Sequence, residues 1–240
     1  MGHPGADGGA SWPTSVEGLI DAQRALAGAQ APDWQAPQDA YAIGACFVCF
    51  ARGAQPPGAR DEPGWAAAAV ALELRIVGRA VARGQAPAAY DPGLLALREG
   101  PLLEAAVRSL PGAPDVLLVN ATGRDHPRRA GLAVHLGAVV GVPTVGVTHR
   151  PLLARGRWPA PERGACSPLV LDGDTVGCWL RTRRGARPLA VHPGWRTDIE
   201  TACTVVLAAT ARVRAPEPLR EARRLARLAR VRERYVEGGS

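Results

Sequence analysis

The feature that most constrains the fold of this chain is a series of short apolar runs with helical segments between them. Three of these runs are apolar on both faces, as strands buried inside a sheet are: YAIGACFVCF, PDVLLVN and PTVGVTH. The segments between them, GLLALREGPLLEAAVRSL and RRAGLAVHLGAVVG, carry apolar residues at helical spacing. Strands interleaved with helices predict an α/β sheet covered by helices.

Further elements are predicted on both sides of this central block. TSVEGLIDAQRALAGA is a predicted helix capped by Thr14 or Ser15. WAAAAVALELRIVGRAVARG is predicted as one or two strands despite its alanines. After residue 167 the sequence predicts strands at SPLVLDG, TVGCWLRTR and RPLAVHPG, then helices over TDIETACTVVLAATAR and LREARRLARLARVRERY. The first two of these strands are joined by the hairpin signal Asp172-Gly173-Asp174.

The chain shows no internal repeat and no sign of a second core, so one domain is predicted over residues 15–235. Residues 1–14 are rich in glycine and polar residues and are expected to form a disordered tail. No apolar run reaches the roughly 18 residues of a membrane span, and no secretory signal pattern is present. We therefore expect a cytoplasmic protein without a membrane partner.

Neither the net charge nor the cysteine spacing identifies a single function for this chain. The 29 basic residues are all arginine and leave a net charge of +7, which suits a phosphate-bearing partner such as nucleic acid. GC-rich codon usage accounts equally well for the missing lysines. Cys46 and Cys49 form a C-x-x-C spacing inside a strand, with no second pair to complete a zinc site. Buried free thiols are expected there.

Several blocks of the sequence, in this order, carry a family resemblance: AYDPGLLALREGP, DVLLVNATGRDHPRRAGLAVHLG, VPTVGVTHRPLL, RPLAVHPGWRTDIETA and APEPLREARRLAR. They resemble endonuclease V, the repair nuclease for deaminated bases. The resemblance spans roughly residues 14–230, nearly the whole chain. It implies an RNase H-like fold, in which a mixed central sheet is flanked by helices and carboxylates group at strand ends.

The resemblance also implies which residues occupy the catalytic positions. In the family three carboxylates hold Mg²⁺, assisted by a lysine and by histidines. Two family residues are kept, the glutamate as Glu99 and a histidine as His126. The others are replaced: the two aspartates by Cys46 and Asn120, the lysine by His149, and two histidines by Thr122 and Trp195.

These replacements predict that the ancestral reaction is lost. Two of the three anionic ligands are neutral here, a thiol is a soft ligand for Mg²⁺, and an amide lacks the charge that holds a hard cation. No resident cofactor is therefore expected. Mg²⁺ or Mn²⁺ would be needed if ancestral activity remained, with Glu99 and the additional carboxylate Asp125 as ligands.

A second group of residues is predicted to bind nucleic acid. Tyr90, followed by Pro92 and Gly93, matches the family's wedge, an aromatic loop that enters a duplex beside the damaged base. Arg128 and Arg129 are predicted to open a helix and bind a phosphate there. Arg196 lies in the stretch that resembles the family's Pro-Gly-His-Arg.

The basic C-terminal helix is predicted to be a solvated face with an inner stripe. Leu219, Leu225 and Leu228 mark that stripe at helical spacing. On this interpretation the arginines of the helix point to solvent.

Three functions remain open at this point. The first is a binding protein for nucleic acid, with degenerate catalytic residues. The second is metal-free chemistry on a small molecule, in which Cys46 is the nucleophile and His149 the base or acid, beside Glu99 and Asn120. The third is residual metal-dependent cleavage through Glu99, Asp125 and His126. The sequence specifies neither an oligomeric state nor a partner chain.

Overall fold

The computed structural model describes residues 11–31, 33–53 and 56–237, and within them the chain forms five helices and eight strands. The helices are α1 (Val16–Gly28), α2 (Leu95–Arg108), α3 (Leu132–Val140), α4 (Ile199–Ala208) and α5 (Glu217–Glu237). The strands are β1 (Ile43–Phe50), β2 (Pro63–Leu72), β3 (Arg75–Gln85), β4 (Val116–Val119), β5 (Thr144–Thr148), β6 (Cys166–Leu171), β7 (Asp174–Leu180) and β8 (Leu189–Pro193). No helix in these ranges is long and apolar enough to cross a membrane.

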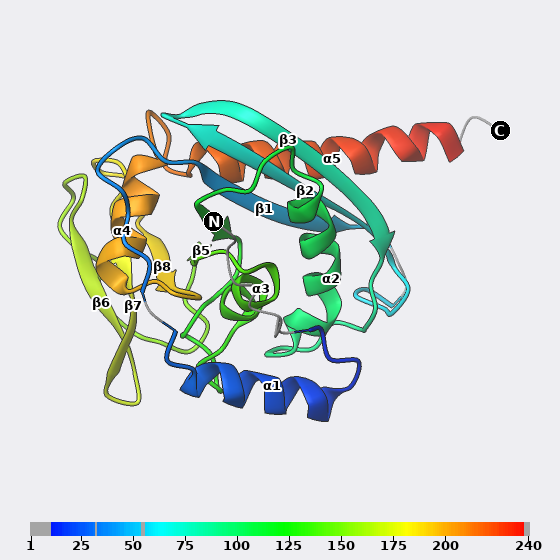
Figure 1. Ribbon diagram of the computed structural model, residues 1–240, viewed down its shortest axis with the longest axis horizontal. Coiled ribbons are helices and arrows are strands. Elements are labelled where there is room, and N and C mark those ends of the chain that lie inside the picture. Colours follow the sequence, from blue (N-terminus) through cyan, green and yellow to red (C-terminus); the bar gives the residue numbers. More distant parts are fainter. Residues whose placement is uncertain (1–10, 32, 54–55, 238–240) are drawn as a thin grey trace, which may run out of the picture.

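All eight strands belong to one sheet, in the order β3-β2-β1-β4-β5-β8-β7-β6. The three central strands β1, β4 and β5 run parallel, and every other neighbouring pair is antiparallel. Parallel strands end at the same edge of a sheet, so the residues after β4 and β5 come together beside β1. The predicted mixed sheet flanked by helices, within a single domain, is confirmed (Figure 1).

Helices cover both faces of the sheet, and alternate residues of the central strands point to opposite covers. On one face Cys46, Leu117 and Val119 pack in a cluster with residues of α2 and α3. On the other face Ala45 and Leu118 pack in a second cluster, with residues of α4. In Figure 1, α5 runs along the sheet beside β1, β2 and β3, and α1 lies at the opposite side of the molecule.

The alanine run in β2 is explained by its position between two helices. Four successive alanines would favour a helix by intrinsic propensity. Here Ala66 and Ala68 contact the cluster under α2, whereas Trp65 and Ala67 pack against Ala226 of α5. Small side chains let both helices approach the strand closely. The prediction of strands in this region is confirmed, as two strands joined by a tight turn.

Helix α1 begins where the sequence predicts, but α3 does not. The Ser15 hydroxyl accepts a hydrogen bond from the Gly18 N–H at 3.0 Å, which caps α1. Helix α3 starts at Leu132 rather than at Arg128, because Arg129 has a φ of 56° that no α-helix accommodates. The turn continues to Gly131, whose N–H donates to the Gly123 carbonyl at 2.8 Å.

The inner stripe of α5 is made largely of small residues. Leu219, Ala222 and Ala226 are buried, whereas Leu228 is 38% exposed. The predicted stripe is therefore wrong at Leu228. The alanines bring the helix axis close to β1 and β2, so that longer side chains beside them reach over the end of the sheet.

The expected N-terminal tail falls largely on residues 1–10, which lie outside the described residues. Trp12 packs against the domain. Its indole Nε1 donates to the Glu104 carboxylate at 2.7 Å, and its ring stacks on His135 with centroids 4.6 Å apart. A Cβ at Gly100 would meet the Trp12 ring at 2.3 Å, so α2 needs a glycine where the indole lies.

Candidate functional site

Three of the predicted catalytic residues meet at the carboxyl end of the central strands. Cys46 of β1, Glu99 of α2 and Asn120, which follows β4, line one cavity of about 200 Å³. The parallel register pairs Cys46 with Val119, which places Asn120 one residue beyond. Tyr90 lies at the same cavity. His149, the fourth predicted member, is not part of this lining.

Cys46 does not have the properties of a nucleophile. Its side chain is fully buried, at 0% exposure. Burial and the nearby charge of Glu99 raise the pKa of the Cys46 thiol far above its ordinary value. A thiol reacts as the thiolate, and this thiol stays protonated and inaccessible. The predicted pairing of Cys46 with His149 in one reactive pocket is therefore wrong.

Glu99, which the resemblance assigns as the one family carboxylate that remains, is not a firmly anionic group. Burial raises the pKa of Glu99 from 4.5 to about 7, against the smaller opposing effect of the Arg98 charge. At neutral pH the carboxyl group is therefore partly protonated.

Asn120 has an unpredicted partner in the C-terminal helix. Arg223 donates from Nη2 to the Asn120 Oδ1 at 3.0 Å, and its guanidinium lies 5.1 Å from the centroid of the Phe47 ring. Within the described part of the chain its buried Nε has no acceptor. Burial and the charge of Arg227 lower the pKa of Arg223. The helical pattern predicted that this arginine points to solvent. That prediction is wrong, because the side chain bonds to Asn120.

The residues at this edge do not fit Mg²⁺ or Mn²⁺. Such ions need anionic oxygen ligands. The site offers a protonated thiol, a carboxyl group with a pKa near 7, and an amide oxygen that already accepts from a guanidinium. Across residues 11–31, 33–53 and 56–237, no three His, Cys, Asp or Glu side chains are grouped so that they could hold a metal ion.

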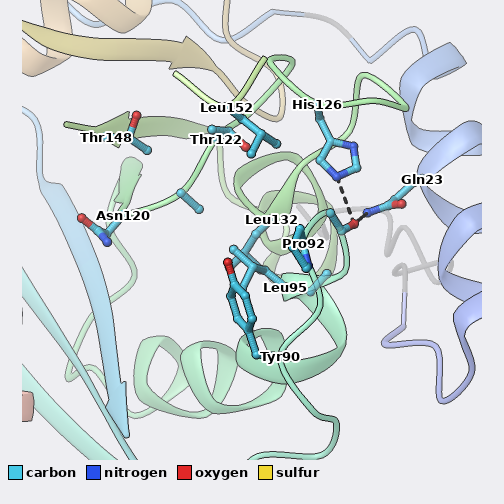
Figure 2. A pocket seen from close by; sticks show the side chains of 13 residues that line it. Gln23, Tyr90, Pro92, Leu95, Asn120, Thr122, His126, Leu132, Thr148 and Leu152 are labelled. Carbon is cyan, nitrogen blue, oxygen red and sulfur yellow. Dashed lines mark hydrogen bonds between the residues drawn. The ribbon is translucent and has the colours of Figure 1, made fainter. Parts of the chain in front are cut away.

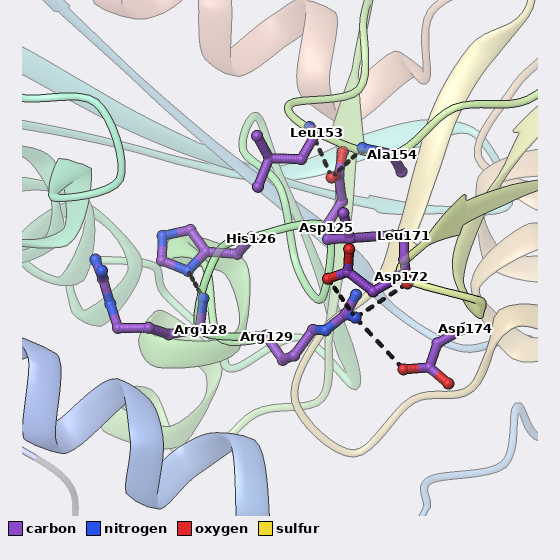
Figure 3. A network of polar contacts seen from close by, with 9 residues as sticks. All are labelled: Asp125, His126, Arg128, Arg129, Leu153, Ala154, Leu171, Asp172 and Asp174. Carbon is purple, nitrogen blue, oxygen red and sulfur yellow. Dashed lines mark hydrogen bonds and ion pairs between the residues drawn. The ribbon is translucent and has the colours of Figure 1, made fainter.

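Asp125 has a structural role that excludes it as a metal ligand. It is fully buried, and its carboxylate accepts three backbone hydrogen bonds, from Leu152 N–H at 2.6 Å, Leu153 N–H at 2.9 Å and Ala154 N–H at 2.8 Å. Figure 3 shows the carboxylate facing this loop. The predicted use of Asp125 to hold a metal is wrong, because its oxygens anchor the loop after β5.

The side chains of Arg128 and Arg129 are engaged in contacts within the protein. Arg129 donates to the Leu171 carbonyl at 3.0 Å and forms ion pairs with two aspartates of the β6–β7 hairpin, Asp172 and Asp174, at 3.3 and 3.4 Å (Figure 3). Arg128 donates to the Gln23 side chain at 2.5 Å. Neither residue lies at a helix start, so the predicted phosphate site at the N-terminus of α3 is not formed.

A second cavity, of about 170 Å³, lies beside the first and shares Tyr90 and Asn120 with it. Its lining is mostly apolar and includes Pro92, Leu95 and Leu132 (Figure 2). We call this cavity the base pocket. Tyr90 is 58% exposed at its mouth, and its N–H donates to the Gly58 carbonyl at 2.7 Å.

The far wall of the base pocket is built around the Gly93 carbonyl. It accepts hydrogen bonds from His126 Nε2 at 3.1 Å, Arg128 Nη2 at 3.0 Å and Gln23 Nε2 at 3.4 Å (Figure 2 shows the first and the last). Gly93 has a φ of 81°, which a glycine adopts without strain. The loop behind Tyr90 is therefore fixed from three directions.

His126 is fully engaged by these contacts. Its Nε2 donates to Gly93, and its Nδ1 accepts the Arg128 N–H at 3.2 Å. Burial lowers the pKa of His126, so the ring is neutral at neutral pH. His126 shapes the pocket wall and has no free nitrogen for proton transfer.

His149 and Arg196 lie outside the base pocket. His149 is exposed after β5, and its Nδ1 accepts from Arg214 Nη2 at 3.1 Å. Partial burial, together with the charges of Arg214 and Arg223, lowers the pKa of His149. Arg196 follows β8 with a φ of 55°, and its carbonyl accepts the Trp34 N–H at 2.7 Å.

Comparison with known proteins places this arrangement in a family. The family model for endonuclease V matches residues 54–224. The chain is 43% identical over 166 residues to endonuclease V from Streptomyces avermitilis, which covers 68% of this chain and 72% of the relative.

Solved structures give the same result. The crystal structure of endonuclease V from Streptomyces avermitilis superposes with a TM-score of 0.80 at 35% identity, over 91% of this chain and 94% of that one. Endonuclease V from Ciona intestinalis, in complex with a 24mer DNA containing an inosine followed by a ribo-adenosine, shares the fold, with a TM-score of 0.69 at 19% identity over 89% and 97% of the two chains. The protein belongs to the endonuclease V family.

Proposed function

We propose that this protein binds nucleic acid and recognises a displaced base, such as the deaminated base inosine, without cleaving the strand through a metal ion. The observation that carries the proposal is the hydrogen bond from Arg223 to Asn120. The resemblance assigns Asn120 to the position of a metal-binding aspartate, and this bond brings a guanidinium beside it. A fixed cation there favours a phosphate and disfavours a divalent metal ion.

The base pocket supports the recognition of a single base. A base taken out of its stack needs an apolar cavity with a few polar groups that read its edge. The Tyr90 ring and the apolar lining supply the apolar cavity. The Asn120 amide and the Thr122 hydroxyl supply the polar groups that read the edge of the base. The inosine-containing DNA bound by the Ciona intestinalis protein, which has the same fold, makes inosine the first base to test.

The proposal is tested by binding in the absence of metal. A labelled single strand with one inosine is titrated with the protein in EDTA, beside the same strand with adenosine. We expect tighter binding of the inosine strand. Replacing Tyr90 by alanine should weaken that binding roughly 5- to 100-fold, as the loss of one stacked base does.

Val77→Ala is the matched control, because Val77 is 60% exposed on the outer strand β3, away from the pocket. This variant should bind like the wild type. Equal affinity for inosine and adenosine strands would contradict base recognition. Binding that appears only after addition of Mg²⁺ or Mn²⁺ would contradict the replacement of the metal by Arg223.

A further inference from the structure

A groove beside the base pocket has no role in the function proposed so far. It encloses about 680 Å³ between the loop after β5, Trp179 of β7 and Arg214. We call it the Trp158 groove. Its lining residues are His149, Arg150, Pro151, Leu152, Leu153, Ala154, Arg155, Trp158, Trp179, Arg187, Pro188 and Arg214. Four are arginines, and none of these described residues carries a carboxylate.

Two cations of the groove, Arg187 and Arg214, are close enough for the charge of one to act on the other. Arg214 Nη2 contacts His149 Nδ1 at 3.1 Å and donates to the Pro188 carbonyl at 3.0 Å. Its buried Nε has no acceptor within the described residues. Burial and the charge of Arg187 lower the pKa of Arg214. The Arg214 side chain as a whole is partly exposed, so a phosphate in the groove would pair with its guanidinium.

The groove also presents an aromatic face to solvent. Trp158 is 56% exposed, whereas Trp179 beneath it is buried and donates to the Gly156 carbonyl at 3.2 Å. The two rings meet edge to face, with centroids 6.4 Å apart. The buried indole therefore supports the exposed one and leaves its outer face open.

The loop that carries Trp158 is fixed along its length. Asp125 binds its beginning, Arg155 exchanges two backbone hydrogen bonds with Val170 at 2.9 and 2.8 Å, and Arg181 donates to the Pro159 carbonyl at 2.8 Å. These hydrogen bonds fix the loop backbone, and the side chains of Trp158 and Leu153, which is 44% exposed, remain in contact with solvent. An exposed aromatic ring fixed in this way is available to stack on a ligand.

The Trp158 groove adjoins the base pocket, because Leu152 lines both cavities. The nucleotides next to a base held in the pocket would therefore lie near the groove. Arginines paired with an exposed aromatic ring fit a chain of phosphates and unpaired bases. The bases of a duplex are stacked on each other and offer no open face to Trp158.

We propose that the Trp158 groove binds the single-stranded flank of the strand recognised in the base pocket, with a base stacked on Trp158 and phosphates on Arg187 and Arg214. This inference rests on the proposed function. It adds a second contact region and a preference for unpaired flanking nucleotides.

The experiment compares two inosine-containing single strands with the full-length protein. One is roughly 12 nucleotides long, enough to fill a binding surface of this kind. The other carries a single nucleotide on each side of the inosine and reaches only the pocket. Trp158→Ala should weaken binding of the long strand roughly 5- to 100-fold and leave the short strand unchanged. Trp158→Phe, which keeps an aromatic face, should retain most of the affinity.

The cationic part of the groove is tested by salt dependence. Arg187→Ala should reduce the slope of log K against log salt by about 0.7 for the long strand, as the loss of one phosphate contact does. Arg75→Ala removes another exposed arginine, on the edge strand β3, and should leave the slope unchanged.

The outcomes separate the two proposals. Wild-type affinity of Trp158→Ala for the long strand, combined with weaker binding of both strands by Tyr90→Ala, would overturn the groove and leave the base pocket standing. Tighter binding to a fully paired duplex than to the long strand would also overturn the groove. If the wild-type protein bound neither strand, the proposed function itself would fail.

Discussion

Arg223 Nη2 lies 3.0 Å from Asn120 Oδ1 and so connects the C-terminal helix α5 to the end of the central strand β4. The two residues are far apart in the sequence, and neither alone indicates the contact. Their pairing reverses the expected charge of this edge of the sheet. The resemblance implies a cluster of anionic oxygens at this edge, whereas the edge presents a guanidinium, a protonated thiol, a neutral amide and the partly protonated carboxyl group of Glu99.

Removal of the Arg223 guanidinium should weaken nucleic-acid binding at every sequence. We expect Arg223→Ala to lower affinity roughly tenfold and to reduce the slope of log K against log salt by about one phosphate contact. Titrations of a labelled strand at several salt concentrations measure both quantities. Arg75→Ala, at the far end of the sheet, is the charge-matched control. An unchanged slope for Arg223→Ala would show that Arg223 contacts no phosphate.

The carboxyl group of Glu99 should make the protein less stable as the pH rises. Its pKa in the folded protein, about 7, lies above the ordinary value of 4.5. The folded state therefore holds a proton that the unfolded chain has lost, and stability falls between about pH 4.5 and pH 7. Glu99→Gln removes this loss and should be more stable than the wild type by on the order of 1–3 kcal/mol at pH 8.

Urea denaturation of both proteins across this pH range measures the difference. Below pH 4.5 the two proteins should unfold with nearly equal free energies, because Glu99 is then protonated in both states. A stability difference that does not change with pH would mean that Glu99 is ionised normally.

Asp125 should matter for stability and not for metal binding. Asp125→Ala leaves three backbone N–H groups without their acceptor, of which the Ala154 N–H makes a buried hydrogen bond, so we expect a loss of about 2–4 kcal/mol in the free energy of unfolding. The loss should be the same in EDTA and in Mn²⁺. Asp174→Ala is the control, since that side chain is 77% exposed and its ion pair contributes little. Stabilisation of the wild type by Mn²⁺ that Asp125→Ala abolishes would restore Asp125 as a ligand.

The main elements of the fold were predictable because local patterns determine them. Buried strands such as β1 and β4 are continuous apolar runs, and Ser15 is a strong helix cap. The start of α3 was not predictable in the same way. It depends on the positive φ of Arg129 and on the close approach of Gly131 to Thr122, where a Cβ would meet the Thr122 carbonyl oxygen at 2.5 Å.

In the candidate site, too, some features could be predicted from the sequence and others depend on contacts between distant segments. Family resemblance located Cys46, Glu99 and Asn120, which the structure brings together. The partners that determine their chemistry come from distant segments, and residue spacing does not reveal them. Arg223 was assigned to solvent because the helical pattern identifies the inner face of α5 and not the strand end that a long side chain reaches. The alanines at 222 and 226 beside it were the available signal of close packing.

The measurement that tests the account most directly is a nicking assay beside a gel shift, on one inosine-containing strand with Mg²⁺ or Mn²⁺. The account predicts that the wild-type protein shifts the strand and leaves it intact, with the same shift in EDTA. Cleavage that Glu99→Ala abolishes would contradict it, because the site would then assemble a working metal centre in spite of Arg223.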